Sequence, residues 1–149
     1  GCSAYHGGVV YAEDSGAVSL IGSTVTGCSA RYGHGGVVYA DGSGVVSLID
    51  SNMTGCSAVR HGGVVYARDS ESLFTEVDAY LSVMGVAFID NSASSASVLY
   101  LYRLDRSSIS DAFFAGNDGV TIQTLGQSLI DWDCRLGSWM PRRGAFEGD

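Results

Sequence analysis

One phrase occurs three times in the first half of the chain, and it restricts the possible folds more than any other feature. Each copy reads Gly-Cys-Ser-Ala, then a short variable gap, then His-Gly-Gly-Val-Val-Tyr-Ala. The copies begin at Gly1, Gly27 and Gly55, so the period is about 27 residues. A period of this length is typical of solenoids and related arrays, in which each copy is one structural unit.

Each copy contains short apolar runs separated by Gly, Ser, Asp and Asn. In the second copy these runs cover residues 24–26, 37–40 and 45–49. Their Val, Ile, Thr and Tyr residues favour strands, while the short length and the paired glycines oppose a helix. One copy cannot bury its apolar face alone, so we expect the copies to stack, with equivalent strands about 4.8 Å apart. The sequence therefore predicts an all-β, parallel β-solenoid.

Two motifs resemble the repeats of a known family. Gly-Gly-Val-Val in the three copies, and Phe-x-x-Asn at residues 88–91 and 114–117, are similar to the Gly-Gly-Ala-Ile and Phe-x-x-Asn repeats of the chlamydial polymorphic outer-membrane proteins. Related repeats occur in large secreted β-helix proteins of microbes and algae. The resemblance covers roughly residues 1–131. It implies a right-handed, single-stranded parallel β-helix in an extracellular or cell-surface protein, and it implies scaffolding rather than a particular activity.

The domain prediction follows from where the repeat weakens. We expect residues 1–131 to form about five coils and residues 132–149 to form an irregular tail. The third copy departs from the pattern after Ala67, which predicts an insertion near residues 70–80. Loops that interrupt a regular scaffold often carry specific function, although a longer turn is the simpler interpretation. The tail contains both tryptophans and the single proline, and it can cap the helix or begin a cysteine-rich module.

Charge and composition exclude several classes of protein. The net charge of −8 opposes nucleic acid or an anionic membrane as partner. The basic residues are all arginine, which excludes Schiff-base lysine chemistry, and no apolar run reaches the length of a membrane span. The chain starts inside a repeat, so we expect it to be part of a longer protein. The expected partners are further repeats of the same parent chain, neighbouring copies, surface glycans or other extracellular proteins.

One repeat position predicts a structural ladder. It holds Cys in the three copies and Asn in the later coils, namely Cys2, Cys28, Cys56, Asn91 and Asn117. We expect the cysteines to form an inward row, with a disulfide between neighbouring copies as the alternative. The asparagine amides can hydrogen-bond from one coil to the next, as stacked amides do in cross-β structures. We expect Cys134 to pair with none of the three ladder cysteines.

The same period predicts two apolar rows. Equivalent positions should be held by Val9, Val37, Val64, Val98 and Val120 in one row, and by Leu20, Leu48 and Leu129 in the other.

Two sets of repeated polar residues could carry chemistry. His6, His34 and His61 each precede Gly-Gly, so they can form a metal site, a pH-sensitive stripe, or a stack of solvent-facing turn residues. Asp14, Asp41 and Asp69 recur after Tyr-Ala and can form an acidic edge for calcium, although Asp is also a common turn residue. No catalytic motif or cofactor motif is present, so no cofactor is expected.

These observations favour a non-enzymatic structural or adhesive segment of a larger extracellular protein, able to form filaments by stacking. The alternative is a carbohydrate-binding or carbohydrate-cleaving β-helix, with its site near residues 70–80. A further alternative is an ice-binding face, which requires regular threonine rows. Residues 23–26 begin such a row, but residues 51–54 and 112–115 break it.

Overall fold

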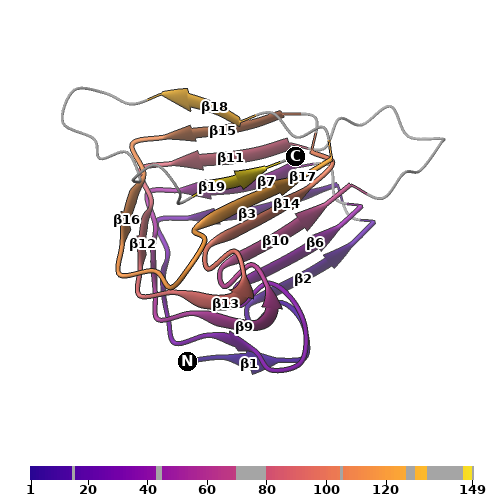
Figure 1. Ribbon diagram of the computed structural model, residues 1–149, viewed down its shortest axis with the longest axis vertical. Coiled ribbons are helices and arrows are strands. Elements are labelled where there is room, and N and C mark those ends of the chain that lie inside the picture. Colours follow the sequence, from indigo (N-terminus) through magenta and orange to yellow (C-terminus); the bar gives the residue numbers. More distant parts are fainter. Residues whose placement is uncertain are drawn as a thin grey trace.

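The computed structural model describes residues 1–14, 16–42, 45–69, 80–104, 106–126, 130–133 and 146–148. Every regular element in these ranges is a β-strand, and every strand pairing is parallel. Figure 1 shows the strands stacked above one another, with the chain passing from sheet to sheet along its length. The prediction of an all-β fold with stacked parallel strands is therefore confirmed, and the arrangement is consistent with a parallel β-solenoid.

Four sheets make up the stack, and we name them A to D in the order in which the chain visits them. Sheet A contains β1 (Ser3–Ala4), β5 (Ser29–Ala30), β9 (Ser57–His61) and β13 (Ser92–Ser95). Sheet B contains β2 (Val10–Glu13), β6 (Val38–Asp41), β10 (Val65–Arg68), β14 (Leu99–Tyr102), β17 (Ile122–Leu125) and β19 (Phe146–Gly148).

Sheet C contains β3 (Ala17–Ile21), β7 (Val45–Ile49), β11 (Tyr80–Met84), β15 (Arg106–Ser110) and β18 (Ile130–Asp133). Sheet D contains β4 (Thr24–Thr26), β8 (Asn52–Thr54), β12 (Ala87–Ile89) and β16 (Phe113–Ala115). Four consecutive strands, one from each sheet, form what we call a layer. The first layer is β1–β4, the second β5–β8, the third β9–β12 and the fourth β13–β16.

The strands pair in the register that the repeat predicts. In sheet B, Val38 lies opposite Val10 on one side and Val65 on the other. In sheet C, Leu48 pairs with Leu20. Each side chain is therefore stacked on its equivalent in the next layer, and the three similar copies form matched rows.

The predicted positions of two members of the apolar rows, Val120 and Leu129, are not confirmed. Leu99 pairs with Ile122, so Val98 is equivalent to Thr121 and not to Val120. The backbone N–H of Val98 accordingly donates to the carbonyl of Thr121 at 3.0 Å. The repeat phrase is absent from this part of the chain, so the sequence offered no glycine pair with which to align it. Leu129 lies outside the described residues, and Trp132 occupies the expected position in that row, opposite Ile109.

The core lies inside the four sheets and is built from the inward-facing row of each strand. Sheet D supplies its largest members, because Met53, Phe88 and Phe114 lie in one row. The two phenylalanine rings stack with centroids 5.1 Å apart. Burial of each such side chain contributes about 1.5–3 kcal/mol to folding.

The structure tests the predictions of an insertion and a tail only in part. Tyr80 of β11 pairs with Val45, so the extra residues of the third copy lie between β10 and β11, and residues 70–79 are outside the described part of the chain. The predicted boundary at residue 131 stays a prediction, as does the prediction for Cys134. Strand β18 crosses that boundary, and β19 pairs with β17 of sheet B.

The second glycine of each Gly-Gly pair lets the backbones of successive layers approach closely at the corner between sheets A and B. A Cβ on Gly36 would lie 2.0 Å from the carbonyl oxygen of Gly63 and 2.6 Å from that of Ser57. Both oxygens belong to the backbone of the next layer, so neither can move aside alone. In the fourth layer Ser97 occupies this position, and no strand of sheet A is described beyond that layer.

We therefore expect Gly36→Ala to lower the free energy of unfolding by about 1–3 kcal/mol, as overpacking does in other cores. Gly16→Ala is the matched control, because a Cβ at Gly16 meets no atom within 4 Å. That change should be neutral or stabilising by up to about 1 kcal/mol. Urea unfolding of both variants measures the difference, and equal effects would contradict the close approach at Gly36.

Candidate functional site

The outer face of sheet B carries a column of tyrosines. Tyr11, Tyr39, Tyr66 and Tyr100 pair in register along β2, β6, β10 and β14. Their ring centroids are 4.9, 5.2 and 5.4 Å apart, with planes within 8° of parallel. The rings cover each other's faces and leave mainly their edges and hydroxyl groups for solvent. This column is consequently a poor platform for stacking a flat ligand.

The three predicted histidines form a second column beside the tyrosines. The rings of His6 and His34 are 5.4 Å apart, and those of His34 and His61 are 4.8 Å apart. Each ring also packs on a tyrosine one layer further on, as His34 does on Tyr66 at 4.6 Å. The backbone N–H of His34 donates to Nδ1 of His6 at 3.1 Å. The Nδ1 atoms of His34 and His61 are buried without a hydrogen-bond partner.

Burial disfavours a charge on these imidazoles. It lowers the pKa of His34 to about 4, and the neighbouring His61, His6, Arg60 and Arg68 add to this effect. The pKa values of His6 and His61 are also lowered, first by burial and then by Arg60. At neutral pH the column is therefore an uncharged stack of rings.

The histidines do not converge on a metal position. A metal binds a ring nitrogen in the plane of the imidazole, and near-parallel stacked rings direct these nitrogens along parallel lines. The planes of His6 and His34 differ by 6°, and those of His34 and His61 by 15°. Among the described residues, no group of three or more His, Cys, Asp or Glu side chains is placed to hold a metal ion.

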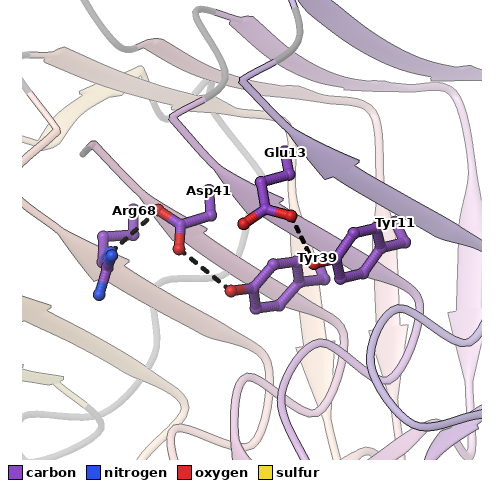
Figure 2. Close-up of polar contacts among 5 residues, drawn as sticks. All are labelled: Tyr11, Glu13, Tyr39, Asp41 and Arg68. Atoms are coloured by element: carbon purple, nitrogen blue, oxygen red, sulfur yellow. Dashed lines mark hydrogen bonds and ion pairs between the residues drawn. The ribbon is translucent and has the colours of Figure 1, made fainter. Parts of the chain in front are cut away.

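A short polar row follows the tyrosine column at the carboxyl ends of the sheet B strands (Figure 2). The hydroxyl of Tyr11 donates to Glu13 at 2.9 Å, and that of Tyr39 donates to Asp41 at 3.1 Å. Nε of Arg68 donates to Asp41 at 2.9 Å, which makes an ion pair with the same carboxylate. The hydrogen bond to Glu13 raises the pKa of Tyr11. Burial, and then Asp41, raise the pKa of Tyr39.

The predicted acidic edge is wrong in its register. Asp41 lies opposite Glu13 and Arg68 in the strand register, whereas Asp14 and Asp69 come one residue after the ends of β2 and β10. The three aspartates therefore do not form one row. The row of Asp41 instead contains Glu13 on one side and Arg68 on the other, so its two carboxylates are followed by a guanidinium group.

The predicted ladder position lies in the connection between the sheet D strand and the following sheet A strand. Cys28 and Cys56 are buried, Cys2 is exposed, and all three are free thiols. Burial is the main reason that the pKa of Cys28 is raised to about 11, and burial also raises that of Cys56. The structure thus places the two central cysteines inward and does not join them by a disulfide.

Asn91 joins the cysteine part of this ladder to the asparagine part. Its Oδ1 accepts from the backbone N–H of Cys56 at 2.9 Å. Its Nδ2 donates to the carbonyl of Met53 and to Oδ1 of Asn117, both at 3.0 Å. The backbone N–H of Asn91 also donates to Asn117 Oδ1, at 2.9 Å. Asn91 is fully buried, so these bonds are made without competition from water.

The remaining outer rows lack the regularity that an ice-binding face requires. On sheet D, Thr24 is followed by Asn52 and then Ala87, and Thr26 is followed by Thr54 and then Ile89. No helix in the described ranges is long and apolar enough to span a bilayer.

Sequence reasoning predicted the alignment of the histidines but missed the tyrosine column and the polar row, although their signals were present. The tyrosines recur with the period of the repeat, so the stacking of tyrosine rings in successive layers could have been predicted. Glu13 and Asp41 each lie two residues after a tyrosine, and side chains two apart share a face of a strand. Arg68 in the third copy could have been assigned to the same row.

Searches of family models, curated proteins and solved structures found no match to this chain.

We expect Asn91→Ala to lower the free energy of unfolding by about 2–4 kcal/mol, because it leaves the Cys56 N–H and the Met53 carbonyl buried without partners. Asn52→Ala is the matched control, because Asn52 is exposed and its Oδ1 accepts a hydrogen bond from the Thr54 hydroxyl at the surface. It should change stability by less than about 0.5 kcal/mol. Urea unfolding tests both, and a small effect at Asn91 would refute its role in joining the layers.

The histidine column predicts a loss of stability in mild acid. An unfolded histidine titrates near its ordinary pKa of 6.5, while folded His34 titrates at about 4. The unfolded state therefore binds more protons between these values, and stability falls as the pH drops from about 6.5. Between pH 6.5 and 5, above the range of most carboxyl groups, His34→Gln should reduce this slope. Urea midpoints measured across that range provide the test, and an unchanged slope in His34→Gln would contradict it.

Proposed function

We propose that this chain is a non-enzymatic structural or adhesive segment of a larger extracellular or cell-surface protein. In this proposal it forms a right-handed, single-stranded parallel β-helix of about five coils, related to the repeats of the polymorphic outer-membrane proteins. Its role is to hold its outer rows of side chains at fixed intervals along a rod.

The observation that carries this proposal is the pairing of each layer with the next. Backbone N–H groups of one layer donate to carbonyl groups of the following layer, both in the strands and at the corners. The tyrosine row of sheet B and the serine row of sheet A repeat one kind of residue along the stack instead of gathering different groups at one point. Such an architecture extends by addition of layers, which suits a spacer or a display surface.

The free sheet edges support the assembly part of the proposal. Among the described residues, strands β1–β4 pair with a neighbour on one side only, and their other edges carry backbone groups suited to further pairing. Further layers of the parent chain, or a neighbouring copy, can pair there in the same register. A head-to-tail contact of this kind does not close on itself and so produces a filament.

A second candidate is a carbohydrate-binding or carbohydrate-cleaving β-helix. The observation that favours it is the row of Glu13, Asp41 and Arg68, in which two carboxylates lie on neighbouring strands beside a guanidinium group. Paired carboxylates are the usual groups of glycoside hydrolysis. However, Asp41 is 9% exposed and already accepts from Tyr39 and Arg68, so it is occupied within the row.

Incubation with a panel of neutral and acidic polysaccharides separates the two candidates. We expect neither new reducing ends nor unsaturated products, because the Asp41 carboxylate is already held by Tyr39 and Arg68. Release of products that is lost in Asp41→Asn would overturn the structural proposal and support the second candidate. Products that persist in Asp41→Asn would also overturn it, and would place the activity elsewhere.

A further inference from the structure

The corner between sheets A and B carries exposed aromatic and basic side chains. Tyr5 follows β1, Arg31 and Tyr32 follow β5, and Val59 and Arg60 lie in β9. We call these five residues the arginine–tyrosine corner. The rings of Tyr5 and Tyr32 stack with centroids 5.5 Å apart, and each residue is about two-thirds exposed, at 64% and 65%. Val59 is 54% exposed in the next layer.

For Tyr32, Val59 and Arg60 this exposure faces sideways and does not arise at the end of the stack. Tyr32 belongs to the second layer and Val59 and Arg60 to the third, so layers cover each of them from above and below. An exposed aromatic and aliphatic group on a regular scaffold is a candidate contact surface. It also differs from the tyrosine column of sheet B, whose central rings are covered by one another.

The corner is basic on a chain that is acidic overall. Through the first four layers, the residues that form sheet A and this corner include no Asp or Glu. These residues are 1–9, 27–37, 55–64 and 91–98. The acids of sheet B lie at the opposite ends of its strands, where Glu13 and Asp41 are the last residues of β2 and β6. The local charge at the corner is therefore positive, although the net charge of the chain is −8.

The two arginines at this corner are exposed, and among the described residues neither forms an ion pair. By contrast, Arg68 on sheet B is paired with Asp41. The field of Arg60 extends over the whole histidine column, since Arg60 lowers the pKa of His6, His34 and His61. Guanidinium groups without internal partners are available for an external anion.

We propose that the arginine–tyrosine corner binds an acidic polysaccharide that runs along the axis of the stack. This proposal deepens the adhesive form of the proposed function and rests on it. Arg31 and Arg60 lie in successive layers and bind carboxylate or sulfate groups of the glycan. The outward edges of Tyr5 and Tyr32 provide amphipathic surface for the sugar rings.

Neighbouring hydroxyl groups extend the same surface over sheet A. Ser3, Ser29, Ser57 and Ser92 form one row beside the corner, and Ser29 Oγ lies 3.4 Å from Ser3 Oγ. Serine hydroxyls both donate and accept, so they can bond sugar hydroxyl groups at intervals of one layer. The chemistry of the surface is thus anion recognition by two arginines, with polar and aromatic contacts around them.

The test is binding of the full 149-residue chain to immobilised polygalacturonate, dextran sulfate and neutral dextran at low salt. We expect binding to at least one acidic polymer, weakening as salt is added, and little binding to neutral dextran. Arg31→Ser and Arg60→Ser should each weaken binding by about tenfold, as loss of a charged hydrogen bond does. Arg106→Ser on sheet C changes the net charge equally and should weaken binding less than about twofold.

Tyr32→Ser separates glycan recognition from simple ion exchange, because it leaves the charge unchanged. It should weaken binding several-fold while the circular dichroism spectrum and urea midpoint stay as in the parent chain. The proposal is overturned if neither acidic polymer binds, if neutral dextran binds as well, or if Arg106→Ser weakens binding as much as the corner variants. It is also overturned if Tyr32→Ser has no effect.

Product analysis on the same samples keeps this test distinct from that of the proposed function. Polysaccharide cleavage would overturn the structural function whether or not the corner binds. Absence of both binding and cleavage would overturn only the corner.

Discussion

Hydrogen bonding between layers is the constraint on which the rest of this structure depends. Parallel strands cannot pair within one layer here, because each of the four strands belongs to a different sheet. Every strand must therefore find its donors and acceptors in the layers above and below. This requirement fixes the register, and the register then decides which side chain lies on which. Core packing, ring stacking and the internal ladder all follow from that one alignment.

Stacking of equivalent residues has opposite consequences for apolar and charged positions. A buried phenylalanine or a half-buried tyrosine gains from lying on its copy, as the rows of Phe88 and Tyr39 show. A repeated charge would instead be repelled by its copy one layer away. The molecule resolves this conflict in two ways. Arg68 follows Asp41 in the same row, and the histidines at the sheet A–B corner are kept neutral by burial.

The sequence was sufficient for the fold because the repeat is nearly exact over the first three layers. It was less informative in the later layers, where Thr121 and Trp132 occupy positions expected for Val120 and Leu129. Without the paired glycines nothing in the sequence fixes the offset, and the errors that follow are one residue at Val120 and three residues at Leu129. The polar row shows a different limit. Glu13, Asp41 and Arg68 are unlike residues at one position, and only the register shows that they are equivalent.

The tyrosine column on sheet B and the histidine column beside it also bear on how such a rod deforms. Flexing it so that sheet B lies on the stretched side would pull apart the tyrosine and histidine rings, which now lie 4.8–5.4 Å apart. On the outer row of sheet A, by contrast, small serine side chains have little contact to lose. The segment should therefore be stiffer in one direction than in the other. A rod with unequal flexural rigidity curves under load toward a defined side, and this would orient its faces relative to whatever surface anchors it.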